Sequence, residues 1–179
     1  MSARVGGIPN SQSSAGHPLR YMTTWSLDHV LREYSIKTQI LKGGVKTEVS
    51  ALAEPETFRF TEFGVNEDLE CAVTPGMPSF IHTHPELKYF AEKTVRWPGH
   101  YQGVRTLIEC GLFDETPVEI DGVRLSPRKF LLGIINPLLV PQQGDGDVCV
   151  MYNTVTGTKN NKPHKIEYLD RKSHTSELQ

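Results

Sequence analysis

The stretch Lys93-Thr94-Val95-Arg96-Trp97-Pro98-Gly99-His100 decides the fold, because it joins one predicted strand to one predicted helix. Its first half is rich in β-branched and aromatic residues, which favours a strand, and the proline then ends that strand. After the glycine, apolar residues follow at helical spacing as far as Gly111, which stands at the usual stop position of a helix. We therefore predict a strand over residues 88–96 and a helix over residues 100–110.

Two further helices have recognisable start signals. Ser26 and Ser126 are of a residue type that caps helix N-termini, and Pro127 suits the first helical position. We expect Pro137 to end the second helix. The apolar residues that follow at helical spacing are Leu27, Val30, Leu31 and Tyr34 in the first helix and Phe130, Leu131, Ile134 and Ile135 in the second.

The remaining pattern is mostly that of strands. Gly43-Gly44 predicts a tight turn between strands over residues 40–42 and 45–49. Residues 9–20 are rich in Pro, Ser, Asn and Gly and predict a loop. Strands mixed with few helices make α+β the predicted fold class. Further strands are predicted over residues 58–60, 69–74, 148–154 and 165–169, the last two around a polar turn at residues 157–163.

Composition excludes several classes of protein. The chain has 179 residues, enough for one sizeable core, with 19 basic and 21 acidic residues and a net charge of -2. No basic excess points to nucleic acid or to an anionic membrane surface. The longest apolar run, near residues 130–140, is too short to span a bilayer, and the first residues show no apolar signal segment. Three widely spaced cysteines fit a reducing compartment, so we expect a cytoplasmic protein.

A metal site is one candidate for the chemistry. His82-Thr83-His84 would place two histidines on the same side of a strand, with His100 or Glu86 as a further ligand. However, the pair stands beside Pro85 in a loop-like stretch, and no third ligand is defined by spacing. We favour a structural or solvent-exposed role, and we assign Cys71, Cys110 and Cys149 to the core rather than to catalysis.

A dinucleotide site is a second candidate. Gly144-Asp145-Gly146 has two glycines of a phosphate-binding fingerprint, but Cys149 stands where the third belongs. The segment also follows a predicted helix and leads into a strand, which reverses the required strand–turn–helix order. The sequence therefore predicts no NAD binding by this chain alone.

The third candidate is Arg96. Its planar fork suits a carboxylate, and the helix that opens at Gly99 and His100 would favour an anion nearby. The alternative is that Arg96 is an ion-paired or solvated strand residue and that His100 only caps the helix. The residues alone leave both interpretations open.

A series of short motifs resembles the saccharopine dehydrogenase-like family. Val5-Gly6-Gly7-Ile8-Pro9 is similar to the segment that leads from the last Rossmann strand into the substrate domain. The other matching residues follow in family order: Tyr21 with Thr24-Trp25-Ser26, then Thr94, Arg96, Pro98, Gly99 and His100, then Gly111-Leu112-Phe113, Val123 with Ser126-Pro127-Arg128, and Gly146-Asp147-Val148.

The resemblance implies a substrate-binding and dimerisation domain over residues 4–170, with a flexible tail at residues 171–179. It implies a mixed β-sheet with helices packed on one face. The Rossmann NAD(P) domain of the family is absent from this sequence, so NAD(P) is implied for longer relatives and not for this chain alone. The implied partners are a small, lysine-like amino-acid substrate, a second copy in a homodimer, and a Rossmann domain or subunit.

The resemblance also assigns roles to residues. Arg96 would hold the substrate carboxylate, Trp25 would wall the pocket, and Ser26, Asp28, Thr94 and His100 would make polar contacts; no catalytic residue is assigned. By this resemblance, Asp28 and His29 occupy the positions at which saccharopine-forming reductases have an arginine and a glycine. An acidic residue at the first position is more like the lysine 6-dehydrogenase branch. The Asp28 carboxylate would pair with a substrate ammonium group or would only complement the helix dipole. Pro75, in the segment Thr74-Pro75-Gly76-Met77, departs from the charged residue common in the family.

Two alternatives belong to other functional classes. In the first, the chain is a non-enzymatic homodimeric interaction domain with the family fold, or the partner subunit of a separately encoded Rossmann chain. A histidine metal-binding module using His82 and His84 is the other alternative.

Overall fold

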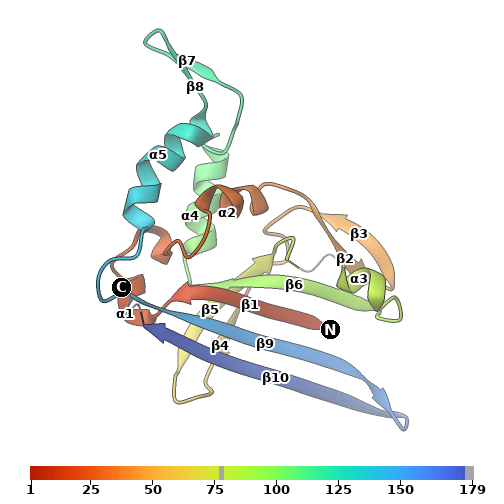
Figure 1. Ribbon diagram of the computed structural model, residues 1–179. Coiled ribbons are helices and arrows are strands. Elements are labelled where there is room, and N and C mark those ends of the chain that lie inside the picture. Colours follow the sequence, from red (N-terminus) through yellow and green to blue (C-terminus); the bar gives the residue numbers. More distant parts are fainter. Residues whose placement is uncertain (77–78, 176–179) are drawn as a thin grey trace.

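The chain folds around one mixed β-sheet, and the computed structural model describes residues 1–76 and 79–175 (Figure 1). The strands are β1 (Ser2–Pro9), β2 (Thr38–Lys42), β3 (Val45–Val49), β4 (Glu56–Phe60), β5 (Glu67–Val73), β6 (Tyr89–Arg96), β7 (Val118–Ile120), β8 (Val123–Leu125), β9 (Gly146–Lys159) and β10 (Lys162–Thr175). The helices are α1 (Ser11–Ser14), α2 (Leu27–Glu33), α3 (Phe80–Thr83), α4 (His100–Glu109) and α5 (Pro127–Leu139), with a short 3-10 helix η1 (Pro18–Arg20). The predicted α+β class is confirmed.

Strand β6 is paired along both of its edges. On one edge it runs parallel to β1, from Ser2 opposite Ala91 to Val5 opposite Thr94. On the other edge the first half of β6 pairs with β2, and its second half pairs with β5. The sheet order is β10-β9-β1-β6-β2-β3, with the β4–β5 hairpin joined to β6. The direction of every β6 side chain is therefore fixed by pairing on two sides.

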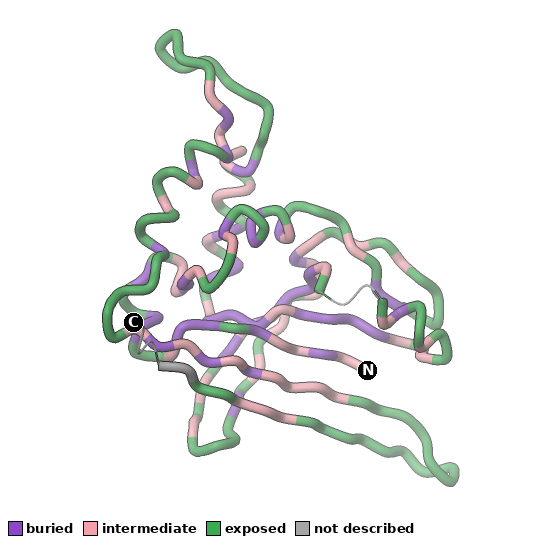
Figure 2. The backbone as a smooth tube through the Cα atoms, viewed as in Figure 1, coloured by how far each residue is buried: buried purple, intermediate pink, exposed green. Residues whose placement is uncertain are grey.

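The two faces of the sheet bury different cores. Helices α2, α4 and α5 lie on one face (Figure 1), where Val30, Val104 and Leu131 pack in one cluster with Ala72 of β5. On the other face the sheet curls, so that β4–β5 and β9–β10 share a second cluster. This cluster is made of Ile8, Phe60, Leu69, Cys71, Val95, Trp97, Val148 and Val150. Figure 2 shows the buried positions concentrated in the middle strands and on the inner sides of the helices.

Most predicted elements are present. Gly43 and Gly44 have φ of 63° and 81° and turn the β2–β3 hairpin, as predicted. Helix α4 ends at Glu109, and Gly111, two residues further on, has φ of 74°, as expected for a helix stop. Ser126 caps α5, because its hydroxyl accepts a hydrogen bond from the Lys129 amide. Ser26 precedes α2, but its side chain makes no capping bond to the helix backbone.

The C-terminal hairpin is longer than predicted. β9 and β10 pair from Lys162 opposite Lys159 as far as Thr175 opposite Gly146, around a turn at Asn160 and Asn161. Residues 171–175 therefore belong to the sheet, and the predicted flexible tail is wrong for them. Continuous pairing with β9 overrides the polar composition of this segment. The rest of that tail, residues 176–179, lies outside the described residues, as does Met77.

Three other predictions need correction. The predicted loop over residues 9–20 contains α1 and η1, and α1 is capped by Asn10, whose side chain accepts from the Ser13 amide. Helix α5 continues past Pro137 to Leu139, and the carbonyl oxygens of Leu138 and Leu139 accept hydrogen bonds from His17 and Thr23.

The predicted apolar stripe of α5 is also divided between core and surface. Leu131 is buried, whereas Phe130 and Ile134 are 53% and 50% exposed. The helix has its apolar residues all round, so only some of them can face α2 and α4. None of the helices in the described part of the chain is long and apolar enough to cross a membrane.

The approach of β1 to β6 generates the first testable prediction. A Cβ at Gly6 would lie 2.5 Å from the Val95 carbonyl oxygen, whereas a Cβ at Gly7 would meet nothing within 4 Å. Gly6→Ala should therefore lower the free energy of unfolding by about 1–3 kcal/mol through overpacking. Gly7→Ala is the matched control and should change stability by less than about 1 kcal/mol. Equal effects of the two variants in denaturant unfolding would contradict this packing.

Candidate functional site

Three polar side chains of β6 share the helix-covered face of the sheet. Glu92, Thr94 and Arg96 alternate along the strand, so all three point to one side. We call this set the β6 polar row. Thr94 is half-buried, and Glu92 and Arg96 are buried. Burying several polar groups side by side is costly, because each loses its contact with water, and this marks the row as a candidate functional site.

Arg96 is a buried cation held by neutral groups. Only 6% of the residue is exposed. Its Nε donates to the Tyr34 hydroxyl at 2.9 Å, and its Nη1 donates to the Val95 carbonyl oxygen at 2.8 Å. The guanidinium carbon lies 5.1 Å from the centre of the Tyr21 ring. Within the described residues, no carboxylate forms an ion pair with Arg96.

Lys93, on the opposite face of the same strand, shows the contrast. It is also buried, but its Nζ lies 3.6 Å from carboxylate oxygens of both Glu54 and Glu56. The structure therefore gives this lysine two counter-charges. Arg96, by contrast, forms no ion pair with a carboxylate among the described residues, and its hydrogen-bond partners are neutral.

Glu92 forms the other end of the row. Its Oε2 accepts from the Thr74 hydroxyl at 3.2 Å and from the Gly76 amide at 3.1 Å, and the Thr74 and Thr94 hydroxyl oxygens lie 2.6 Å apart. Burial raises the pKa of Glu92 to about 7, although the hydrogen bonds from Thr74 and Gly76 oppose this shift. Glu92 therefore lies close to its protonation midpoint at neutral pH.

His100 lies behind Arg96 rather than beside an open surface. It is 1% exposed, and both ring nitrogens have protein partners. Nδ1 lies 3.0 Å from the Leu19 carbonyl oxygen and Nε2 lies 3.0 Å from the Tyr34 hydroxyl. Burial, together with the charge of Arg96, lowers the pKa of His100 to about 3, so the ring is neutral.

The predicted residues of the 24–29 segment lie at the start of α2. Trp25 is 54% exposed and stacks on His29, with ring centres 5.8 Å apart, and the Ser26 hydroxyl lies 2.7 Å from Nδ1 of His29. A shallow groove runs between this segment and α5. Its lining residues are Trp25, Ser26, Leu27, Asp28, Leu132, Gly133 and Asn136.

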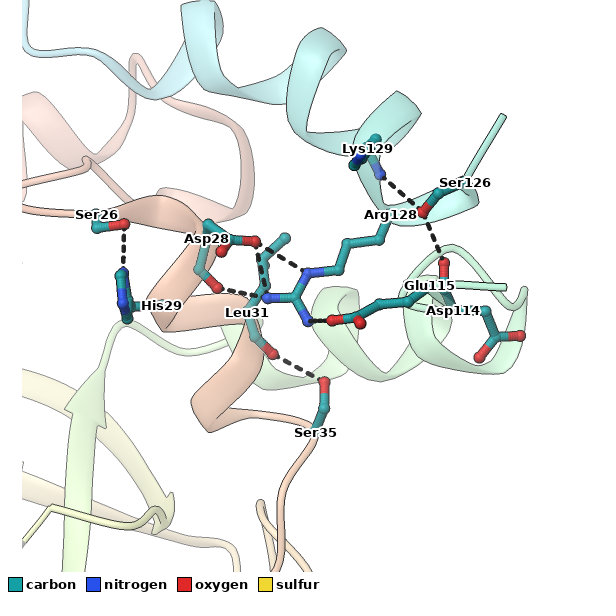
Figure 3. A network of polar contacts seen from close by, with 10 residues as sticks. All are labelled: Ser26, Asp28, His29, Leu31, Ser35, Asp114, Glu115, Ser126, Arg128 and Lys129. Atoms are coloured by element: carbon teal, nitrogen blue, oxygen red, sulfur yellow. Dashed lines mark hydrogen bonds and ion pairs between the residues drawn. The ribbon is translucent and has the colours of Figure 1, made fainter. Parts of the chain in front are cut away.

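Asp28 has a protein partner in this groove. Nε and Nη2 of Arg128 donate to its Oδ1 at 3.1 and 2.9 Å, and Nη2 also donates to its carbonyl oxygen at 2.7 Å (Figure 3). Nη1 of Arg128 donates to Glu115 at 3.1 Å. The side chain of Arg128 is only 6% exposed. Asp28 therefore links α2 to α5 through Arg128.

The structure thus divides the predicted site residues into two groups. Thr94, Arg96 and His100 belong to the β6 polar row and the groups behind it, whereas Trp25, Ser26 and Asp28 line the groove at the start of α2. In the part of the chain that the structure describes, no hydrogen bond or ion pair joins the two groups directly.

Comparison with known proteins decides the family. A family model described as the saccharopine dehydrogenase C-terminal domain matches residues 1–179. The chain belongs to this family. Its fold is similar to that of apo histidine-tagged saccharopine dehydrogenase (L-Glu forming) from Saccharomyces cerevisiae, with a TM-score of 0.72 at 16% sequence identity. The similarity covers 95% of this chain and 52% of the yeast chain, so the chain spans about half the length of that protein.

Sequence reasoning missed part of this candidate site. Tyr34 was predicted only as an apolar residue of a helix, yet its hydroxyl contacts both Arg96 and His100. Glu92 was not singled out. The alternation of Glu92, Thr94 and Arg96 along one strand was the available signal, because three polar groups on one face of a buried strand are unusual.

The histidine and cysteine candidates do not assemble into a site. In the described ranges, no three His, Cys, Asp or Glu side chains are grouped to hold a metal ion. Nδ1 of His82 accepts from the Lys46 ammonium at 2.6 Å, and His84 lies 3.2 Å from Glu86. Cys71 is buried as predicted, but the predicted core position is wrong for Cys110, which is exposed. Burial raises the pKa of the Cys71 thiol to about 12, which disfavours the nucleophilic thiolate.

The glycine pair before β9 does not fit a dinucleotide. Gly144-Asp145-Gly146 joins α5 to β9, which is the helix-to-strand order expected from the sequence. The Asp145 carboxylate accepts from the Gln142 amide at 2.7 Å and lies 2.8 Å from Nε2 of His17. A carboxylate folded into its own turn would repel a pyrophosphate.

The raised pKa of Glu92 generates a prediction on stability. The folded protein binds a proton at Glu92 up to about pH 7, whereas the unfolded chain releases it near pH 4.5. Stability should therefore fall as pH rises through this window, by up to about 3 kcal/mol from this group. Glu92→Gln removes this titration. The stability of the variant relative to the wild type should therefore increase as pH rises from about 4.5 to 7.

Denaturant unfolding at a series of pH values measures this difference. Glu109→Gln, at an exposed position of α4, is the matched control and should leave the pH profile unchanged. A constant offset between Glu92→Gln and the wild type at all pH values would show that Glu92 does not titrate as described.

The contact of Asp28 with Arg128 generates a second prediction. Asp28→Ala should lower the free energy of unfolding by about 1–2 kcal/mol, since buried Arg128 loses one of its two carboxylates while the other is exposed. Glu115→Ala removes the more exposed partner and should cost less than about 1 kcal/mol. The reverse order of the two effects in thermal or denaturant unfolding would contradict this assignment.

Proposed function

We propose that this chain is the substrate-binding side of an NAD(P)-dependent amino-acid oxidoreductase of the saccharopine dehydrogenase-like family. The observation that favours this function is the buried guanidinium of Arg96, which has no ion pair in the described residues. Its partners Tyr34 and Val95 are neutral. A carboxylate is the anion that matches an arginine fork, and an amino-acid substrate provides one.

The rest of the β6 polar row favours a ligand with an amine as well. Glu92 lies on the same face of β6 as Arg96, with the Thr94 hydroxyl between them. A carboxylate at one end and a guanidinium at the other complement a zwitterion. A lysine-like amino acid, as in the lysine 6-dehydrogenase branch, is our choice. Because Asp28 is bonded to Arg128, this choice rests on Glu92 and on the sequence resemblance.

The chemistry of the complete enzyme would be oxidation of an amine to an imine. The carbon that bears the amine would lose a hydride to the nicotinamide, and the nitrogen would lose a proton. The nicotinamide would be held by the half of longer relatives that this chain does not span. In this proposal the chain binds and orients the amino acid and is not competent alone.

The free thiols favour a reducing location. Cys71, Cys110 and Cys149 are all unpaired, although Cys110 is exposed. We therefore assign the protein to the cytoplasm as part of this proposal.

Calorimetric titration of the chain tests the proposal. We expect weak binding of L-lysine and saccharopine, weaker binding of lysinamide, which lacks the free carboxylate, and no binding of NAD. Arg96→Gln should weaken lysine binding about 10- to 100-fold, as expected for loss of a charge-assisted hydrogen-bonded contact. It should leave lysinamide binding nearly unchanged.

Arg59→Gln is the matched control, because Arg59 is an exposed arginine that is ion-paired with Asp68. It should bind lysine as the wild type does. Equal binding of lysine and lysinamide, or full binding by the Arg96 variant, would refute a carboxylate site at Arg96. Tight binding of NAD would refute the proposal that this chain binds only the amino acid and that the nicotinamide is held by another part of longer relatives.

A homodimeric interaction domain, with or without a separate Rossmann subunit, is the second candidate function. It is favoured by an apolar surface on α5 and the β7–β8 hairpin, where Val118, Ile120 and Phe130 line one hollow and Ile134 and Leu138 continue the helix face. These five side chains are 43–55% exposed. Exposed apolar surface of this kind is typical of protein–protein interfaces.

The oligomeric state tests this second function. If a dimer forms through this surface, Phe130→Asp with Ile134→Asp should convert it to a monomer in light scattering. Val45→Asp places the same change on β3, where Val45 is 65% exposed, and should leave the dimer intact. A wild-type monomer at high concentration would refute the homodimer.

A further inference from the structure

The hydrogen bonds behind Arg96 have only one possible order. The Leu19 carbonyl oxygen can only accept, so Nδ1 of His100 must be the nitrogen that carries the proton. Since the ring is neutral, Nε2 has a lone pair and accepts the Tyr34 hydroxyl proton. The remaining lone pairs of the Tyr34 oxygen then accept from Nε of Arg96.

Burial keeps this order fixed. His100, Tyr34 and Arg96 are all less than 10% exposed, so water does not replace any of the three bonds at low cost. Burial also raises the pKa of Tyr34 to about 12, which keeps the proton on the phenol. The Tyr21 ring lies 5.4 Å from the His100 ring and under the guanidinium of Arg96, and it limits movement of both.

The chain of bonds decides which end of Arg96 is left for a ligand. A guanidinium has five N–H groups; Tyr34 takes the one on Nε and Val95 takes one on Nη1, which leaves three on Nη1 and Nη2. No described residue accepts a hydrogen bond from Nη2. The two Nη groups form the end of the fork, and that end suits the two oxygens of one carboxylate.

We propose that His100 is a positioning residue, which acts through Tyr34 to hold Arg96 with its Nη end free for the substrate carboxylate. This inference rests on the proposed carboxylate site and changes the role of His100 within it. Direct contact between His100 and a ligand would require loss of its bond to Leu19 or Tyr34. The histidine therefore controls the orientation of the arginine without touching the substrate.

The first experiment is independent of any ligand. Nitrogen-15 NMR of the free chain at neutral pH should show His100 as the neutral tautomer with the proton on Nδ1. The Arg96 Nε–H should exchange slowly with solvent, because it is buried and bonded to Tyr34. An imidazolium, or a proton on Nε2, would overturn the inference whether or not the chain binds an amino acid.

A matched pair of variants separates positioning from packing. His100→Gln places an amide oxygen near the position of Nε2 and can still accept from Tyr34. His100→Asn keeps a donor near Leu19 but loses that acceptor. We expect slow exchange of the Arg96 Nε–H in the Gln variant and fast exchange in the Asn variant. The same result in both variants would overturn the inference.

A comparison of ligands then tests whether the hydrogen bonds from His100 through Tyr34 to Arg96 affect binding. The ratio of lysine to lysinamide affinity should fall about tenfold in His100→Asn and remain near the wild-type value in His100→Gln. Tyr34→Phe removes the link itself and should resemble the Asn variant, and it replaces that variant where His100→Asn does not fold. A wild-type chain with no preference for lysine over lysinamide would refute the proposed function. The NMR result would still decide whether His100 positions Arg96 through Tyr34.

Discussion

The pairing of β6 on both edges is the constraint on which the rest of the structure depends. A strand that is paired on two sides cannot rotate, so each of its side chains is committed to one of two cores. Val95 enters the curled core against Ile8 and Val148, while Thr94 and Arg96 face the helices. The close approach of β1 to β6 at Gly6 belongs to the same constraint, because a side chain there would separate the two strands. The polar row exists because the sheet leaves those three side chains no other direction.

The charged side chains on the two faces of β6 have different partners. Lys93 is neutralised by Glu54 and Glu56, and Arg4 of the neighbouring strand is bonded to Glu56 at 2.7 Å. That cluster is balanced, and it holds the curled strands together. On the helix-covered face, Arg96 has aromatic and carbonyl partners only, and Glu92 has only hydroxyl and amide donors. The described residues of this face therefore lack the ion pairs that neutralise Lys93 and Arg4 on the other face.

Local signals predicted the elements that depend on local chemistry. The Gly43-Gly44 hairpin, the helix after Gly99 and the helix that starts at Pro127 all follow from residues within a few positions of one another. The missed elements depend on distant partners. β1 has two adjacent glycines and a weak strand pattern, yet it lies between β6 and β9. The β7–β8 hairpin is an exception, because its turn at Asp121 and Gly122 is a local signal that the predicted elements do not include.

The site divided in the same way. The family motifs pointed to Thr94, Arg96 and His100, and these residues do lie together. The sequence could not show that Tyr34 stands between Arg96 and His100, because the contact joins α2 to β6 and α4 across more than 60 positions. It also could not show that Asp28 is bonded to Arg128, since that bond joins residues 100 positions apart. The sequence also did not show that His100 is buried, with both ring nitrogens bonded to Leu19 and Tyr34.

Helix α2 connects the two groups of site residues. Asp28 lies in its first turn and is bonded to Arg128, and Tyr34 directly follows its last residue and is bonded to Arg96 and His100. The helix has seven residues, so these two points are only about 9 Å apart along its axis. A helix this short has little stability of its own and depends on such anchors. The bond from Asp28 to Arg128 of α5 therefore helps to fix the position of Tyr34 at the other end of the helix. Both the groove and the β6 polar row depend on the position of α2.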